Sequence, residues 1–189
     1  TLARVIANTT SATFMQLNAT ASGKKDMEAV VESAKNNQGM YGKKTILFID
    51  EIHRFNKGQQ DYLLPFVEDG TVILIGATTE NPYFEVNGAL LSRSVIFELK
   101  KLTEEDIRVL LLRAVNDSEK GMGAYNAQID EDALAFLANV SNGDARAALT
   151  AIELGILTTE RSADGIIHIT LAVASEFIQK RVISYDNTA

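Results

Sequence analysis

Several residue types that carry chemistry in other proteins are absent or scarce in this chain. The 189 residues contain no cysteine and only two histidines. Disulfide bonds and zinc sites built on thiolates are therefore excluded, and a histidine metal site is disfavoured because His53 and His168 are far apart in sequence.

Long apolar runs and excess positive charge are also lacking. No run approaches the roughly 18 apolar residues of a membrane span, and the first residues do not follow the basic-then-apolar pattern of a signal peptide. We therefore expect a cytoplasmic protein without a membrane partner. The net charge of −7 gives no support for nucleic-acid binding through an overall basic surface, so any such contact needs a local patch or several subunits.

Hydrophobic residues make up 46% of the chain, and continuous apolar runs alternate with segments in which apolar residues recur at helical spacing. Strands are predicted for residues 14–17, 45–49, 71–79 and 94–100. Continuous apolar runs separated by helices are typical of strands buried on both faces of a parallel sheet. The first part of the chain is therefore predicted to be an α/β layer structure.

Helices are predicted around this sheet and throughout the second part of the chain. Helical spacing of apolar residues occurs near the start, where Leu2, Val5 and Ile6 share one face, and again in residues 26–34. Asn56 is expected to cap a helix that runs to about residue 66 and stops or kinks near its end at Pro65. From Thr103, a capping residue, helices are predicted to about residue 115, over 130–140 and 144–157, and after Thr170. This second part is expected to be an all-helical bundle.

Polar residues follow two of the apolar strands. Asp50 and Glu51 end the first, in "TILFIDEIHRF", and Thr78 and Thr79 end the second, in "TVILIGATT". Ligands of open parallel sheets sit at the carboxyl ends of the strands. An aspartate there can hold Mg²⁺ and a glutamate can accept a proton from water. A lone Asp-Glu pair is more often a solvated strand end, but the matching polar end about 25 residues later favours a site.

These motifs resemble those of AAA+ ATPases. "ILFIDEIH" is similar to the Walker B motif, "GATTENP" to sensor 1, "LLSR" to the arginine-finger motif of the clamp-loader branch, and "GDARAAL" to sensor 2. The stretches "TASGKKDMEAVVESAK", "DEIHRFNKGQQDYLLPFVEDG" and "GATTENPYFEVNGALLSR" resemble the RarA/MgsA family, the replication-associated recombination ATPases related to Werner-interacting protein. This resemblance implies a P-loop NTPase-type base domain over residues 1–101 and a helical lid over 102–189.

The resemblance also implies roles for individual residues. Asp50 would be associated with Mg²⁺, Glu51 would be the general base, and Thr79 would be the sensor 1 residue, with Thr78 a weaker candidate. Arg93 resembles the finger that reaches a neighbouring subunit's nucleotide, and Arg146 the sensor 2 arginine that contacts phosphate.

Three of the residues in or near these motifs also have simpler interpretations. Arg93 could be a surface residue at the start of a strand, and Ser94 and Val95 follow it where the family often has another basic residue. Arg146 could be a solvated partner of Asp144. His53 matches a helicase box in letters only, and we expect it to have a structural or coupling role.

The glycine-rich phosphate loop of this fold is missing from the sequence. Gly23 and Lys24 are followed by Lys25 rather than by Ser or Thr, and Asn18 stands where the first glycine would be. In the resembled family, "TLARVIA" directly follows the Gly-Lys-Thr of that loop. The sequence is therefore interpreted as a fragment that begins after the loop. We expect this fragment to bind ATP poorly or not at all. The strands that hold Thr78 and Val95 are each expected to lack their usual neighbour, and such unpaired edges favour self-association.

The function implied by the resemblance is that of a DNA-associated ATPase. It would couple hydrolysis of ATP, with Mg²⁺, to remodelling at stalled replication forks, as a homo-oligomer with single-stranded or branched DNA and a single-strand binding protein as partners. Alternatives are a clamp-loader subunit, a RuvB-like branch-migration motor and a non-hydrolysing scaffold subunit.

Overall fold

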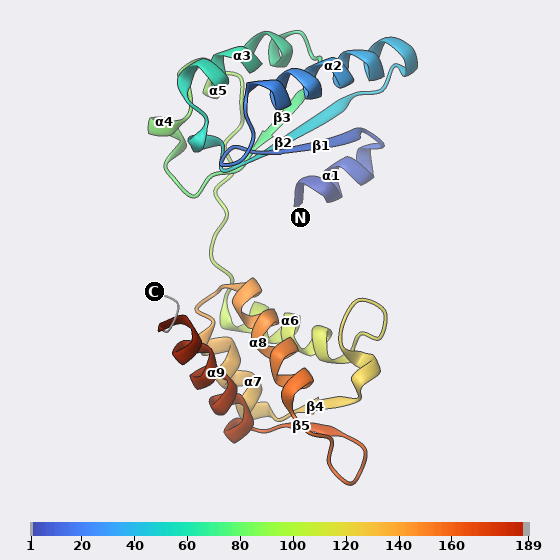
Figure 1. Cartoon of the computed structure of the whole chain (residues 1–189), viewed down its shortest axis with the longest axis vertical. Coiled ribbons are helices and arrows are strands. Elements are labelled where there is room, and N and C mark those ends of the chain that lie inside the picture. The colour runs from blue at the N-terminus through green and yellow to red at the C-terminus, as the bar shows by residue number, and fades with distance from the viewer. Residues whose placement is uncertain (1, 187–189) are drawn as a thin grey trace. The chain divides into compact units, whose positions relative to one another are not determined.

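The chain folds into two compact units. The computed structural model describes residues 2–186, and the side chains of residues 2–179. The boundary between the units lies between Phe97 and Glu98 (Figure 1). Each unit has its own cluster of buried apolar side chains. The two are therefore described one at a time.

A three-stranded parallel sheet forms the centre of the first unit. Its strands are β1 (Thr13–Asn18), β2 (Thr45–Asp50) and β3 (Ile73–Gly76), in the order β1-β2-β3. The middle strand β2 is the most buried, as its continuous apolar sequence predicts. The predicted α/β class and these three strands are confirmed.

Helices cover both faces of this sheet. Figure 1 shows α2 (Lys24–Tyr41) and α3 (Lys57–Glu68) on one face and α1 (Leu2–Thr10) on the other. Asn56 caps α3 as predicted, by accepting a hydrogen bond from the backbone N–H of Gln59. The helix does not stop at Pro65 but continues to its end at Glu68. The core on the α2 and α3 face is formed by Leu17, Ala19, Met27, Val30, Ala34, Leu47, Ile49, Ile52, Phe55, Leu63 and Val72.

The orientation of α1 differs from what its apolar pattern suggests. Its buried residues are Ala3 and Ala7, whereas Leu2, Val5 and Ile6 remain exposed. Two alanines allow the helix backbone to approach the sheet closely, and Arg4 lies over the ring of Phe14 on β1. Contact with the sheet is thus made by the small residues rather than by the larger ones.

The strand predicted for residues 94–100 is not formed. The segment is extended but belongs to neither sheet, and Val95, Phe97 and Leu99 are 76–81% exposed. A strand requires a neighbour for its N–H and C=O groups, and within the described residues β3 pairs only with β2. The apolar pattern therefore predicted a strand at a position where no partner strand is available.

Short helices lie in the connections of the first unit. They are η1 (Ile52–Arg54) after β2, followed beyond β3 by α4 (Pro82–Glu85) and α5 (Gly88–Leu91). Asn81 and Asn87 start the last two by accepting hydrogen bonds from Tyr83 N–H and Ala89 N–H. These elements are too short to show helical periodicity in the sequence.

The second unit is mainly helical. Its helices are α6 (Glu104–Asn116), α7 (Glu131–Val140), α8 (Ala145–Thr158) and α9 (Leu171–Asp186), with the short turn η2 (Gly123–Tyr125). Thr103 and Asp106 form the predicted capping box of α6, in which each side chain accepts a hydrogen bond from the backbone N–H of the other residue. The hydrogen bonds that the Asp106 carboxylate accepts from the backbone N–H and the hydroxyl of Thr103 hold its pKa below its ordinary value.

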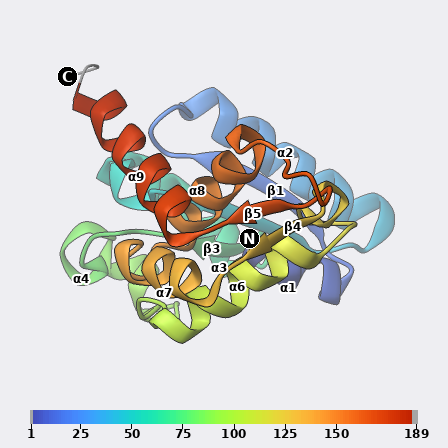
Figure 2. The same cartoon turned by 90° about the horizontal axis from the view of Figure 1, so that it is seen from below.

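The second unit also contains a pair of parallel strands. The strands β4 (Ala127–Ile129) and β5 (Ile167–Ile169) lie side by side in both Figure 1 and Figure 2. At three residues each they are too short to be distinguished from loops by pattern alone. The helical lid is thus present, with an additional ladder that the expectation of an all-helical bundle missed.

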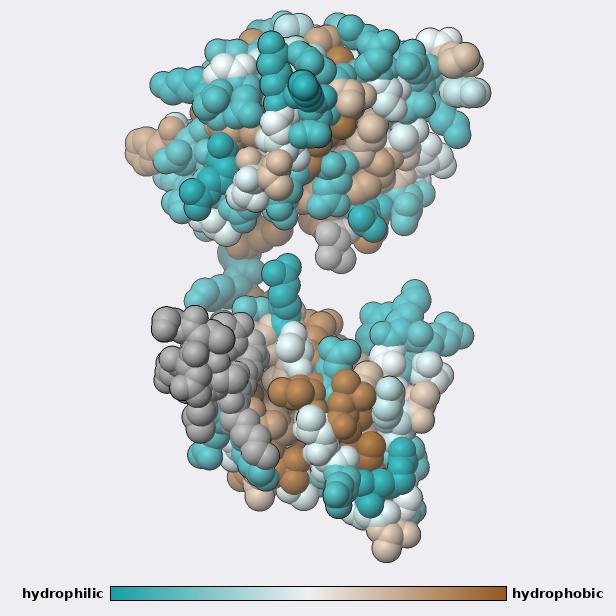
Figure 3. Space-filling model, viewed as in Figure 1, coloured by the Kyte–Doolittle hydropathy of each residue, from teal (hydrophilic) through white to brown (hydrophobic). Residues whose placement is uncertain are grey.

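The apolar residues of α8 are divided between the core and the surface. Ala148, Ala151, Ile152, Gly155 and Ile156 are buried against the other helices. Leu149, Leu154 and Leu157 are 37–54% exposed and lie on the opposite side, where Figure 3 shows hydrophobic residues over this helix. The helix therefore carries more apolar surface than the core of its own unit covers.

Candidate nucleotide site

The polar ends of β2 and β3 lie at the same edge of the sheet. The two strands are parallel and adjacent, with Ile49 opposite Gly76, and Ala77 N–H donates to Ile49 C=O at 2.9 Å. Asp50 and Glu51 therefore leave the sheet beside Thr78 and Thr79. The acidic pair and the two threonines thus lie at one edge of the sheet, as the interpretation of the sequence requires.

Glu51 has a strained backbone that turns the chain at this edge. Its φ of 55° and ψ of 43° lie in the left-handed region. In a regular parallel ladder Ala77 C=O would accept from Glu51 N–H, but here it accepts from Ile52 N–H at 3.0 Å. Glu51 is thus an extra residue directly after β2, between the two hydrogen bonds that Ala77 makes, as in a β-bulge. Such an insertion redirects a side chain, and the left-handed conformation of Glu51 costs about 1–2 kcal/mol.

Asp50 presents oxygen atoms beside this turn. Its Oδ1 accepts from Glu51 N–H at 3.2 Å, and its side chain is half-buried. No cluster of three or more acidic or histidine side chains that could hold a metal ion occurs among the residues that the structure describes. This donor set suits Mg²⁺, which is commonly held by one or two carboxylates together with water and substrate phosphates.

The two threonines after β3 have different surroundings. Thr78 Oγ1 accepts from Glu80 N–H at 3.0 Å and lies 2.8 Å from His53 Nδ1. Thr79 is exposed, and its hydroxyl has no hydrogen bond within the described residues. Thr79 is therefore the one whose hydroxyl is available to a ligand.

Arg93 follows α5 and makes its contacts within the first unit. Its guanidinium forms an ion pair with Glu68 on α3 at 2.5 Å and donates to Ala89 C=O at 2.9 Å. The side chain is 43% exposed. None of its hydrogen bonds or ion pairs involves the residues at the ends of β2 and β3.

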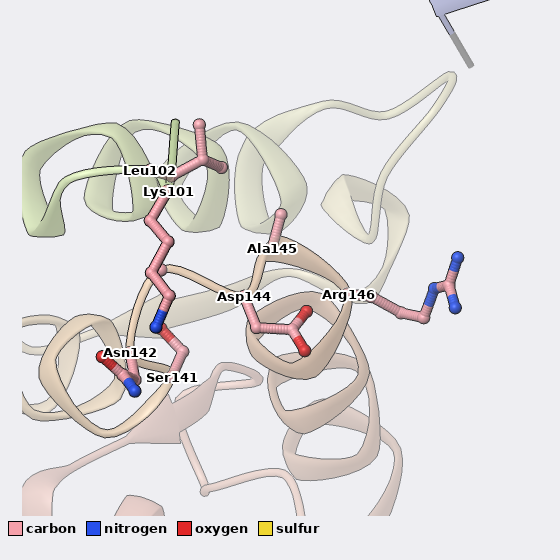
Figure 4. A pocket seen from close by; sticks show the side chains of 8 residues that line it. Lys101, Leu102, Ser141, Asn142, Asp144, Ala145 and Arg146 are labelled. Carbon is pink, nitrogen blue, oxygen red and sulfur yellow. The ribbon is translucent and has the colours of Figure 1, made fainter. Parts of the chain in front are cut away.

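Arg146 lies in the second unit, in the first turn of α8. It borders an open pocket of about 700 Å³ whose other lining residues are Lys101, Leu102, Ser141, Asn142, Gly143, Asp144 and Ala145. Figure 4 shows its guanidinium directed away from the Lys101 side of the pocket. Among the described residues it forms no ion pair with Asp144, which caps α8 by accepting from Ala147 N–H at 3.0 Å.

A buried amide that the sequence analysis did not identify fixes the segment before Arg93. Gln60 on α3 is 1% exposed. It donates to Phe55 C=O at 3.0 Å and Glu85 C=O at 3.1 Å, and accepts from Asn87 N–H at 2.6 Å. The available signal was a glutamine three residues before Leu63, on the apolar face of a predicted helix.

Replacing Gln60 by Leu is expected to destabilise the first unit by about 1–3 kcal/mol, because buried backbone groups lose their partners. Urea unfolding followed by circular dichroism measures this loss. Gln38→Leu, on the exposed side of α2, is the matched control and is expected to change stability little. Equal stability of the two variants would contradict the role assigned to Gln60.

Known families and proteins resemble the chain over most of its length. Residues 1–102 match the family described as "ATPase family associated with various cellular activities (AAA)", and residues 123–189 match "AAA C-terminal domain". Replication-associated recombination protein A of Bacillus subtilis is 50% identical over 185 residues, which are 98% of this chain and 43% of that protein. ATPase WRNIP1 of Dictyostelium discoideum is 48% identical over 82% of this chain and 18% of its own length.

Solved structures share the fold. The RuvB Holliday junction branch migration motor of Thermotoga maritima matches with a TM-score of 0.75 and 24% identity, over 94% of this chain and 56% of that one. The chain spans less than half the length of the curated relatives described above. These relatives confirm the resemblance to the replication-associated recombination proteins, and the chain belongs to the AAA family of ATPases.

Proposed function

We propose that this chain is the central part of a DNA-associated ATPase that couples ATP hydrolysis to remodelling of stalled replication forks. Residues 1–101 would be the base domain and residues 102–189 the lid. The family match and the names of the relatives support the general class. The single observation that carries the proposal is the shared edge at which Asp50, Glu51 and Thr79 emerge.

The residues at this edge suit phosphoryl transfer. When bound, Mg²⁺ would neutralise charge that develops on the phosphates of ATP. Asp50 would hold the ion, and Glu51 would accept a proton from the attacking water. Thr79 would hydrogen-bond the terminal phosphate, with Thr78 behind it.

Two arginines would complete the site from other parts of the assembly. Arg93 would stabilise the transition state in a neighbouring subunit, and Arg146 would contact phosphate from the lid. A finger supplied in trans makes hydrolysis depend on a homo-oligomer. The partners would be single-stranded or branched DNA and a single-strand binding protein, in the cytoplasm.

Other functions remain as alternatives to this one. The fold similarity to RuvB favours a branch-migration motor as the second candidate. A clamp-loader subunit or a non-hydrolysing scaffold would share the same fold. A scaffold has no need of a glutamate in a strained turn beside a candidate metal ligand, because the strain lowers stability and serves no binding role.

The proposal is tested by ATP turnover of the full-length protein that contains this chain. We expect hydrolysis that requires Mg²⁺, is abolished by chelation and increases when single-stranded or forked DNA is added. Four-way junctions serve as the comparison substrate, since a junction-specific increase would favour the RuvB-like motor. Absence of turnover under all of these conditions would favour the scaffold.

A further inference from the structure

His53 lies between the candidate base and the end of β3. Its Nδ1 is 2.8 Å from Thr78 Oγ1, and its Nε2 is 3.3 Å from Glu51 Oε2. The His53 side chain is 8% exposed, whereas that of Glu51 is 33% exposed. A nearly buried ring thus joins the carboxylate to Thr78, which follows the neighbouring strand β3.

The hydrogen-bonding capacities of the three groups fix the direction of the chain of contacts. A carboxylate can only accept, so its 3.3 Å ion-pair contact with His53 Nε2 is favourable when Nε2 carries the hydrogen. In the neutral ring Nδ1 then accepts from the hydroxyl of Thr78, whose oxygen still accepts from Glu80 N–H. A protonated ring would donate at both nitrogens and keep the contact with Glu51. The contact with Glu51 is therefore kept in both charge states of the ring, whereas the direction of the hydrogen bond with Thr78 reverses on protonation.

The element that carries His53 is anchored to the sheet. Its neighbours Ile52 and Phe55 are 3% and 2% exposed and belong to the core of the first unit. A Cβ on Gly76 would lie 3.0 Å from Ile52 Cδ1, so the absence of a side chain on β3 lets η1 pack closely. His53 is thus held near the end of β3, the strand that the threonines follow.

We propose that His53 is a positioning residue that orients the carboxylate of Glu51 and makes that orientation depend on Thr78. The inference rests on the proposed function, in which Glu51 is the base. Contact of a terminal phosphate with the threonine segment would be transmitted to Glu51 through the ring. Glu51 needs such a support because its exposed carboxylate has several rotamers, and a misplacement of about 1 Å can cost 100-fold in rate.

The test uses ATP hydrolysis by the full-length protein with substitutions at His53. His53→Ala is expected to lower kcat by about 10- to 100-fold, with KM for ATP changed little, because the residue acts on the base rather than on ATP. His53→Gln, whose amide can reach the position of Nε2, is expected to recover part of kcat. His53→Asn, whose amide corresponds to Nδ1, is the matched control and is expected to recover less.

Three further variants separate a positioning role from a structural one. Thr78→Val removes the hydroxyl but keeps the shape, and is expected to lower kcat with KM unchanged, whereas Thr78→Ser is expected to keep most activity. Combining His53→Ala with Glu51→Gln is expected to add almost no loss beyond Glu51→Gln alone, because both act on one group. Additive losses would overturn the inference.

The outcomes also distinguish failure of this inference from failure of the proposed function. Turnover of Glu51→Gln equal to that of the unmodified protein would contradict the function itself. Loss of turnover in Glu51→Gln, with normal kcat in His53→Ala, would overturn only the role of His53. If His53→Ala does not fold, nitrogen NMR of the unmodified protein supplies the test: a protonated Nε2 whose signal shifts in Glu51→Gln supports the contact, and an Nε2 signal unaffected by that change contradicts it.

Discussion

Replacing Glu51 by Gln in the full-length protein is expected to lower kcat for ATP hydrolysis by about 100- to 10,000-fold, the usual contribution of a general base. Glutamine keeps the size of the side chain and an oxygen that can face His53, but it cannot take a proton from water. ATP binding is therefore expected to persist. Steady-state turnover and nucleotide affinity, measured on the same preparation, give the two quantities.

Glu80→Gln is the matched control for this experiment. Glu80 is an exposed carboxylate that follows the threonines after β3, so its removal changes the charge near the same edge without altering the turn at Glu51. Turnover close to that of the unmodified protein is expected. A comparable loss in both variants would show that charge at the edge, rather than the identity of the base, governs the rate.

Replacing Arg93 by Ala is expected to lower kcat by about 1,000-fold or more, because an arginine finger stabilises charge that develops only in the transition state. Arg93→Lys is expected to recover little, since an ammonium group lacks the forked geometry of the guanidinium. Folding should be nearly unaffected, because the exposed pair with Glu68 contributes about 0–1 kcal/mol. Turnover and thermal unfolding measure the two effects.

A mixing experiment determines whether Arg93 acts in trans. Arg93→Ala subunits keep Glu51, and Glu51→Gln subunits keep Arg93, so a mixed oligomer contains some interfaces with both groups intact. Recovery of turnover on mixing is expected for a finger supplied by a neighbour. No recovery, although the subunits are shown to mix, would mean that Arg93 acts within its own subunit or not at all. Glu68→Ala is the control for loss of the ion pair and is expected to keep activity.

The three strands of the first unit and the long helices of both units can be predicted from the sequence because they depend on local patterns. β2 is a continuous apolar run, and α6 begins at a capping box formed by residues three apart. The segment 94–100 has an equally good strand pattern but no partner, and pairing is a property of the sheet rather than of the segment. Periodicity also could not show that α1 presents Ala3 and Ala7 to the sheet.

The candidate site was predicted as a set of residues but not as a set of contacts. Parallel adjacent strands require Asp50 and Thr79 to emerge at one edge, and this follows from topology alone. The contact between His53 and Thr78 joins positions 25 residues apart and requires the turn at Glu51, which no local pattern predicts. The hydrogen bonds of Gln60 could not be predicted for the same reason, because its partners Glu85 and Asn87 lie far along the chain, in the segment after β3.

The left-handed turn at Glu51 places stability and catalysis in conflict at one position. Glycine and asparagine tolerate this backbone conformation better than glutamate does, so either would relax the turn. Directed evolution for thermal stability alone would therefore tend to replace this glutamate. The product would be a more stable protein without the proposed general base. A selection scheme for this domain therefore has to score turnover together with melting temperature, so that loss of the proposed base is detected.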